Sequence, residues 1–223
     1  MPRYAASLTA SHFIHIHGVQ QAVKPLTDAV ERLLRNASFA VLHTPIPLPG
    51  ADPLPVDQDE RLLLCQLADS SIAAELDAAA RAIAGVREVS HQTMACERIT
   101  PGGPDDPSTA GTAVSWIVQY NGPAQDPRAF HAYYRTHHVP IVNRMPGIRF
   151  LNWYVPKPSE RLAGLRYVEY LQLVQAMFDD LDGLLAMRAS RERKEGLQDF
   201  NNYPPFEGPV THQAMLSRRI TIR

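Results

Sequence analysis

The chain has 223 residues, of which 22 are basic and 23 acidic, and its formal net charge is −1 at pH 7. This balance gives no electrostatic reason to expect a nucleic-acid partner or binding to an anionic membrane. No apolar run approaches the roughly 20 residues that cross a bilayer, and the histidine-containing N-terminal stretch is unlike a secretion signal. We therefore expect a cytoplasmic protein with one large domain or two domains of about 100 residues each.

The first half of the chain reads as strand, helix, two strands, helix and strand. Strands are expected at 12–18, 38–43, 61–68 and 86–99, and helices at 23–34 and in the alanine-rich stretch 70–84. Residues 100–112 contain three prolines, three glycines and no large apolar side chain, which is typical of a solvated linker. The sequence thus predicts an N-terminal domain at 1–99 and a C-terminal domain at 113–223.

The second half repeats this order of elements. Strands at 113–120, 148–155, 166–174 and 211–222 alternate with a helix opened by Asp126 or Pro127 and an amphipathic helix at 176–188. The shared βαββαβ order, with few matching residues, indicates duplication followed by divergence. The predicted fold class is α+β, with tandem duplicated ferredoxin-like domains.

The helix of the second half carries the most specific pattern in the chain. Apolar and aromatic side chains recur at steps of three and four, the spacing of one helix face, at Phe130, Tyr133, Tyr134, His137 and Ile141. His138 points about 100° away from its neighbour, so the two imidazoles should have different surroundings. Pro140 lacks a backbone donor and is expected to bend or interrupt the helix just after the histidines.

His-Val-Pro at 138–140, followed by Met-Pro-Gly at 145–147 and a strand, resembles the signature of EthD-like proteins in the dimeric α/β-barrel superfamily. The resemblance covers roughly the second half of the chain and is strongest over 113–155. It implies antiparallel ferredoxin-like sheets packed as a barrel, here within one chain, and a small apolar molecule as partner. It also implies no organic cofactor. Tandem halves weaken the need for a homodimer without forbidding one.

His138 is the candidate catalytic residue. Imidazole titrates near neutrality, so a histidine at a helix end beside a cavity can act as a general acid or base. The alternative is a histidine that caps the carbonyls freed by Pro140, and the resemblance gives the two interpretations equal weight. His137 is expected to be structural or to lie on the surface.

Six further residues are candidates for substrate binding, because they are aromatic or polar and lie beside the histidine or on predicted strands: Tyr134, Trp116, Tyr120, Trp153, Tyr167 and Glu169. Strand alternation puts Trp116 and Tyr120 on one face, where we expect them to line the barrel interior. The alternative is that the aromatic side chains simply fill the core. Tyr167 and Glu169 share a strand face, and Glu169 would pair with a histidine or a substrate hydroxyl unless it is exposed at an edge.

Other features are weaker. His15 and His17 point the same way on a strand, but a metal site needs a third ligand. His43 or His91 could supply it in space, but the spacing does not indicate this, and we expect no metal. Cys65 and Cys96 read as buried thiols. The proline-rich insertion 44–59 is expected to be an ordered loop. The insertion 191–210, with Phe200, Tyr203 and Phe206, should either cover a cavity mouth as a lid or pack on the other half or on a second subunit.

Two functions fit these patterns. The first is a cofactor-independent enzyme acting on an apolar, aromatic or polyketide-like molecule through histidine acid/base chemistry, of isomerase, decarboxylase, dehydratase or oxygenase type. The second is a noncatalytic small-molecule-binding or accessory protein of the same fold. The absence of nucleotide-binding and serine-hydrolase motifs removes the main support for those activities.

Overall fold

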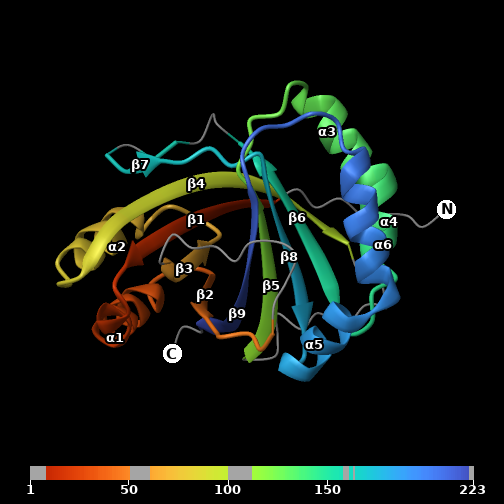
Figure 1. Ribbon diagram of the computed structural model, residues 1–223. Helices are drawn as coiled ribbons and strands as arrows, with labels where there is room; N and C mark the ends of the chain where they lie inside the picture. The colour runs from red at the N-terminus through yellow and green to blue at the C-terminus, as the bar shows by residue number, and fades with distance from the viewer. Residues whose placement is uncertain (1–8, 51–60, 100–111, 158–160, 163, 221–223) are drawn as a thin grey trace.

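A computed structural model describes residues 9–50, 61–99, 112–157, 161–162 and 164–220 (Figure 1). The elements of the first half are β1 (Thr9–Gly18), the 3-10 turn η1 (Gln20–Ala22), α1 (Val23–Leu34), β2 (Ala40–Pro45), β3 (Arg61–Leu67), α2 (Ala73–Arg81) and β4 (Val86–Ile99). They match the expected order. The expected linker lies outside the described residues except for Thr112.

The second half begins with β5 (Thr112–Tyr120), α3 (Pro127–Tyr133), the π-helical turn η3 (Tyr134–His138) and α4 (Val139–Val142). It continues with β6 (Phe150–Pro156), β7 (Arg166–Tyr167), β8 (Gln172–Phe178), α5 (Leu181–Ala189), α6 (Arg191–Asp199), the 3-10 turn η5 (Phe200–Asn202) and β9 (Val210–Ile220). No helix among these described residues is long and apolar enough to span a membrane.

Eight strands form one closed antiparallel barrel. Their order is β1-β3-β2-β9-β5-β8-β6-β4, and β4 returns to pair with β1. The halves join at two seams, β2 with β9 and β4 with β6. In the sheet, the strands of the first half lie in the order β4-β1-β3-β2 and those of the second half in the order β9-β5-β8-β6. Each half therefore places its fourth, first, third and second strands side by side in the same order. Closure leaves no open edge in the barrel, and β7 adds to β4 from outside as a short parallel strand.

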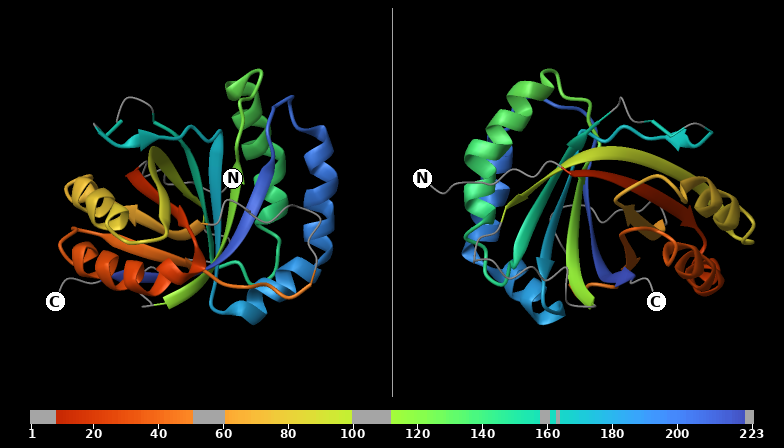
Figure 2. Two further views of the ribbon diagram at one scale, coloured as in Figure 1. Left: turned by 60° about the vertical axis from the view of Figure 1, so that its left-hand side comes forward. Right: turned by 180° about the vertical axis from the view of Figure 1, so that it is seen from behind.

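The helices cover the outside of the barrel in two groups. α1 and α2 lie against the first half, while α3, α4, α5 and α6 lie against the second (Figures 1 and 2). Alternate side chains along each strand therefore point either toward the helices or into the barrel. One helix-facing core contains Ile14, Leu26 and Leu63 in the first half, and the other contains Phe130 and Leu151 in the second.

The barrel interior combines an apolar cluster, which includes Phe13 and Met215, with polar side chains of which several bond one another. Gln66 Nε2 donates to the Tyr154 hydroxyl at 3.1 Å, and that hydroxyl donates to Gln175 Oε1 at 3.1 Å. Near the other end, Arg61 donates to Gln119 Oε1 at 2.7 Å. These bonds offset the desolvation of the buried polar groups, which would otherwise cost about 1–3 kcal/mol each.

Three elements differ from the sequence expectation. The strand expected at 166–174 is broken, because β7 pairs with β4 for two residues and β8 starts only at Gln172. The helix expected from Ala176 starts at Leu181, because Ala176 and its two successors complete β8. The insertion at 191–210 contains the helix α6. Its Phe200, Tyr203 and Phe206 pack on the helix-facing core of their own half, and not on the other half as one of the two interpretations expected.

Candidate functional site

The helix that carries the histidines begins where the sequence indicated. Asp126 is the N-cap, and its carboxylate accepts hydrogen bonds from the backbone N–H groups of Arg128 and Ala129 at 2.9 and 3.1 Å. Pro127 occupies the first turn, where its missing N–H costs nothing. The start of the helix is therefore fixed by local chemistry.

Pro140 changes the helix without ending it. The backbone N–H of Val139 donates to the Tyr134 carbonyl five residues earlier, which is the pattern of a π-helical turn. Beyond the proline, the N–H of Asn143 donates to the Val139 carbonyl at 2.9 Å, so α-helical bonding resumes. A proline cannot supply the donor that would continue regular bonding at its own position, and the wider turn lies just before it.

The two histidines have different surroundings. His137 is exposed, and its ring stacks on Tyr133 with 4.3 Å between centroids. His138 lies on the inner side of the helix, where the Tyr134 and Tyr203 rings are 5.0 and 5.3 Å from its ring. Only His138 is therefore placed to act inside the protein.

His138 forms a buried pair with Asp199. Its Nδ1 lies 2.9 Å from Asp199 Oδ2, and the side chains are 12% and 11% exposed. The other carboxylate oxygen of Asp199 accepts the Tyr133 hydroxyl at 2.8 Å. A carboxylate can only accept, so Nδ1 carries the proton and Nε2 has a free lone pair. Among the described residues, none forms a hydrogen bond with that Nε2.

The surroundings keep His138 neutral. Burial lowers the pKa of its imidazole below the usual value near 6.5, and the positive charge of Arg193 acts in the same direction. The hydrogen bond and the negative charge of Asp199 oppose this effect and raise the pKa. The net result is a lowered pKa, so at neutral pH the ring is an oriented base.

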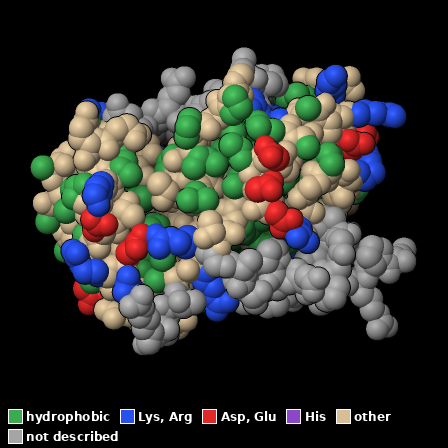
Figure 3. Space-filling view, turned by 90° about the horizontal axis from the view of Figure 1, so that it is seen from below, with side chains coloured by type: hydrophobic (Ala, Val, Ile, Leu, Met, Phe, Trp, Pro, Cys, Tyr) green, Lys and Arg blue, Asp and Glu red, His purple; other side chains and the backbone are tan. Residues whose placement is uncertain are grey.

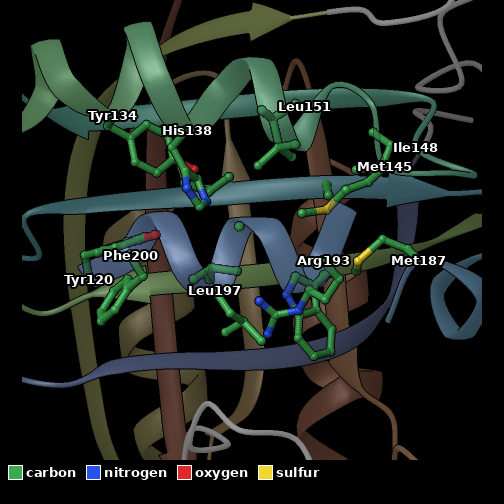
Figure 4. A pocket seen from close by; sticks show the side chains of 16 residues that line it. Tyr120, Tyr134, His138, Met145, Ile148, Leu151, Met187, Arg193, Leu197 and Phe200 are labelled. Atoms are coloured by element: carbon green, nitrogen blue, oxygen red, sulfur yellow. The ribbon is translucent and has the colours of Figure 1, made fainter. Parts of the chain in front are cut away.

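A cavity of about 60 Å³ lies between the second-half sheet and its helices, and His138 lines it (Figure 4). The sheet contributes Trp116 and Tyr120, and the opposite wall is formed by Leu197 and Phe200. Most of the wall is apolar, and burial raises the pKa of Tyr120 to about 12, so its phenol stays neutral. A water needs about 10–15 Å³ of such space, so the cavity has room for a few waters.

Helix α6 completes the site. Its N-cap is Ser190, whose hydroxyl accepts a hydrogen bond from the backbone N–H of Arg193 at 3.1 Å. The helix brings Arg193, Gly196 and Leu197 to the cavity wall. Gly196 allows a close approach: a Cβ at this position would lie 3.5 Å from His138 Cε1 and 3.3 Å from Met145 Cε. Arg193 supplies a positive charge to a wall that is otherwise largely apolar.

Four of the residues expected at the site meet in this cavity: His138, Tyr134, Trp116 and Tyr120. The face of the barrel was predicted wrongly, however. Trp116 and Tyr120 point toward the helices, and the cavity lies outside the barrel wall. Trp153 is on the same face but does not line the cavity, because its Nε1 donates to Gln172 Oε1 at 2.8 Å and its ring packs beside Tyr134.

Tyr167 and Glu169 lie elsewhere. Tyr167 is in β7, where its ring contacts His91 and the Arg161 guanidinium. The Glu169 side chain is 62% exposed and pairs with Arg161 at 3.6 Å. The break between β7 and β8 removes this segment from the barrel wall, so neither residue reaches His138.

The sequence analysis predicts neither Asp199 nor Arg193 as a site residue, because it predicts no helix in the insertion at 191–210 that holds them. The available signal was Ser190, a favourable N-cap, followed by the helix-forming run RERKE. Its apolar stripe is too thin to reveal the helix by periodicity.

The His-x-His pair does not build a metal site in the described part of the chain. His15 and His17 are parallel, with 6.5 Å between ring centroids. No group of three or more His, Cys, Asp or Glu side chains in the described ranges has a suitable arrangement. Burial lowers the pKa of His15 well below its usual value, so this ring is neutral inside the barrel. Cys65 and Cys96 are buried free thiols.

An antiparallel eight-stranded barrel with helices on its outer face is the architecture of the dimeric α/β-barrel proteins. A solved anthrone oxidase-like protein superposes with a TM-score of 0.61 at 10% identity, covering 97% of this chain and 95% of that one. A chlorite dismutase mutant from Candidatus Nitrospira defluvii gives 0.50 at 8% identity, with 96% and 93% coverage. At such identities the likeness shows the fold alone.

The model of the EthD domain matches residues 122–203, a segment that contains His138, Arg193 and Asp199. This match confirms the resemblance to EthD-like proteins seen in the sequence. An EthD family protein from Bacillus halodurans is 21% identical over 46% of this chain and 95% of its own, with a TM-score of 0.36. No curated protein matches the sequence.

Proposed function

We propose that this protein is an enzyme that moves a proton on a small apolar molecule, with His138 as the general base and acid. The observation that carries the proposal is the His138–Asp199 pair, which fixes the tautomer and leaves Nε2 at an apolar cavity. A neutral, oriented imidazole of this kind contributes about 10²–10⁴-fold to a proton transfer.

The chemistry follows from the cavity walls. Nε2 takes a proton from a carbon or hydroxyl of the substrate, and the electron pair stays on the substrate as an enolate or phenolate. The Arg193 charge stabilises this anion in a site with little water. The imidazolium then returns the proton to another atom of the same molecule, which makes isomerisation the simplest net reaction and requires no oxidant.

The cavity also limits the substrate. Aromatic and aliphatic walls favour a flat apolar body and offer few polar partners. At about 60 Å³ the cavity is smaller than the ~150 Å³ that holds benzene in an engineered protein, so a ring-sized substrate requires α6 or Phe200 to move outward. This assigns to α6 the role of a movable wall, which corresponds to the lid, one of the two interpretations of the insertion at 191–210.

The test uses hydrogen–deuterium exchange, which detects proton abstraction from carbon whatever the product is. The full chain is incubated in D₂O with a panel of small phenols, quinones and lactones, and deuterium uptake on carbon is followed by NMR. The His138→Gln variant should lose about 100-fold or more of the protein-dependent rate for any active compound. His137→Gln is the matched control, because it removes the adjacent exposed imidazole, and its rate should stay near wild type. Equal rates for wild type and His138→Gln would refute the catalytic role.

A second candidate function is binding without catalysis, and the small size of the cavity favours it. In this case compounds of the panel bind between the sheet and α6 but exchange no faster than in buffer. Ligand-observed NMR on the same samples separates the two functions, because binding with no exchange in any sample supports the second.

We also propose that the chain consists of two domains that arose by duplication. The shared strand order supports an origin by duplication, with domains at 1–99 and 113–223 and a linker at 100–112. α1 of the first half ends at Leu34 and carries no histidine. The activity is accordingly assigned to the second half alone.

A further inference from the structure

Three tyrosines surround His138 at one end of its cavity. Tyr120 on β5 and Tyr134 in η3 line the cavity and are 3% and 2% exposed. Tyr203 follows η5, and its ring centroid lies 5.3 Å from that of His138. Figure 4 shows Tyr120, Tyr134 and His138 together at one end of the cavity, with Met187 at the other. This end of the cavity therefore combines a base with phenol groups.

Tyr120 is the middle member of this tyrosine cluster. Its ring centroid lies 5.8 Å from that of Tyr134 and 6.2 Å from that of Tyr203. Its hydroxyl oxygen is 3.5 Å from the Tyr203 hydroxyl oxygen, and it also forms a hydrogen bond with the Tyr134 hydroxyl. In the part of the chain that the structure describes, the three hydroxyl groups form hydrogen bonds only with one another.

The cluster has one donor more than it can use internally. Each phenol has one O–H donor, and two links join the three hydroxyls in a row, so the third O–H has no acceptor within the row. The Tyr120–Tyr203 separation of 3.5 Å exceeds the usual O–H···O distance of about 2.7–2.8 Å, so this link is weak. Because Tyr120 and Tyr134 both line the cavity, a ligand there can supply the missing acceptor.

The hydrogen bonds favour Tyr120 as the phenol that donates into the cavity. Burial raises the pKa of Tyr120 to about 12, and hydrogen bonds with Tyr203 and Tyr134 oppose this rise, as expected when its oxygen accepts from both neighbours. The pKa values of Tyr134 and Tyr203 lie well above 10 because of burial and the adjacent Tyr120. All three phenols are neutral at pH 7, and the bonds that Tyr120 accepts make its own O–H a stronger donor.

We propose that the His138 cavity binds a carbonyl compound with an acidic C–H bond beside the carbonyl, and that the carbonyl oxygen accepts a hydrogen bond from Tyr120. This inference rests on the proposed function of His138. Nε2 removes the proton, the C–H electron pair forms a C=C bond, and the carbonyl π pair moves to the oxygen to give an enolate. Tyr120 donates to that oxygen more strongly as negative charge develops on it. The imidazolium then returns a proton to carbon, so no oxidant or reductant is needed.

Acetone is a suitable probe because it fits without movement of α6. It has four heavy atoms, and the cavity of about 60 Å³ has room for about four to six groups the size of a water. The His138 side chain is 12% exposed, and no histidine is visible on the described part of the lower face of the molecule (Figure 3). A small probe is therefore preferable to one that needs a wide entrance.

The test measures binding of acetone to the full-length protein by NMR titration and exchange of its methyl protons by NMR in D₂O. Tyr120→Phe should weaken binding about two- to tenfold, the usual effect of one neutral hydrogen bond. It should slow the protein-dependent exchange about tenfold or more, because the lost bond is stronger to the enolate than to the ketone. Tyr134→Phe should slow exchange less. Tyr167→Phe is the matched control, since it removes a phenol hydroxyl in β7, outside the cavity, and should change neither measurement.

The variants separate this inference from the role of His138. His138→Gln should abolish the protein-dependent exchange and leave acetone binding near wild type. If His138→Gln still exchanges, the proposed function fails, while binding to Tyr120→Phe still tests the carbonyl site. Wild-type binding and exchange in Tyr120→Phe would overturn the inference, and so would no acetone binding to the wild type.

Two further outcomes test the choice of Tyr120. A larger loss of exchange in Tyr134→Phe than in Tyr120→Phe would make Tyr134 the donor, and loss of binding in Arg193→Gln alone would assign the oxygen to the arginine; each contradicts the inference. If Tyr120→Phe fails to fold, NMR of the wild-type protein decides. Bound acetone should give nuclear Overhauser effects to the Tyr120 ring protons, and effects to Arg193 and Leu197 without Tyr120 would overturn the assignment.

Discussion

Replacing Asp199 with Asn tests whether the carboxylate sets the state of His138. The variant keeps the size of the side chain and one oxygen that can accept from Nδ1, and it places an amide NH₂ beside the Tyr133 hydroxyl, which can accept from it instead of donating. It removes the negative charge. A hydrogen bond to a charged group contributes about 1.5–3 kcal/mol and a neutral one about 0.5–1.5 kcal/mol. The Nδ1-protonated form should therefore lose about 1–1.5 kcal/mol of preference, roughly tenfold in the tautomer ratio. Solvent screens little of the interaction between Asp199 and His138, because both side chains are nearly buried.

The pKa of His138 should move as well. Both contributions of Asp199, its hydrogen bond and its charge, raise the pKa against the lowering effect of burial. Removing the charge should thus lower the pKa further, so the ring stays neutral to more acidic pH. In catalysis, the acidic limb of kcat/KM should shift to lower pH while the plateau falls, because the base is weaker and less often in the correct tautomer.

The assay needs no substrate. Long-range ¹H–¹⁵N spectra of the imidazole report which nitrogen is protonated, and a titration from neutral to acidic pH gives the direction of the pKa change. Asp179→Asn is the control, since it makes the same chemical change in an exposed ion pair with Arg149 that is outside the cavity. If the tautomer and pKa of His138 are the same in Asp199→Asn as in the wild type, the pairing argument fails.

Two further predictions concern stability. Burial lowers the pKa of His43 from 6.5 to about 4, so the folded state takes up this proton less readily than the unfolded state. The free energy of unfolding should fall by about 3 kcal/mol in all as the pH drops from 6.5 to about 4. In denaturant titrations, His43→Asn should make the free energy of unfolding depend less on pH over this range. The same pH dependence in the variant and the wild type would contradict this. Gly196→Ala should raise the helix preference of α6 by up to about 1 kcal/mol, so thermal unfolding should occur at or above the wild-type temperature. Its added methyl group should reduce the volume of the cavity, so cavity ligands should bind less tightly. Tighter ligand binding in this variant would mean that Gly196 does not limit the space beside His138.

The sequence predicted those parts of the fold that local chemistry determines. The start of α3 follows from an Asx cap and a first-turn proline, and the order of strands and helices along the chain follows from periodicity and turn residues. Alternation also placed Trp116 and Tyr120 together. It could not show which face of the strand is the barrel interior, because both faces of a barrel wall covered by helices are buried.

The candidate site could be predicted only in part, because its members come from distant segments. His138 stood out through its own helix, but its partner Asp199 is 61 residues away in a segment with little apolar periodicity. Glu169 is a candidate because it lies inside the strand predicted at 166–174, and the actual break in that strand leaves its side chain exposed to solvent. A pairing across such a separation depends on how α6 packs on the histidine helix, which a single sequence does not encode locally.

The two seams that close the barrel are both formed within one polypeptide. Closure is therefore unimolecular, and dilution cannot open the ring as it would open a barrel made from two separate chains. A substitution in such a chain occurs once per barrel instead of twice. Each half can consequently differ in sequence from its counterpart, and of the described helices that follow the first strand of each half, only that of the second half carries histidines.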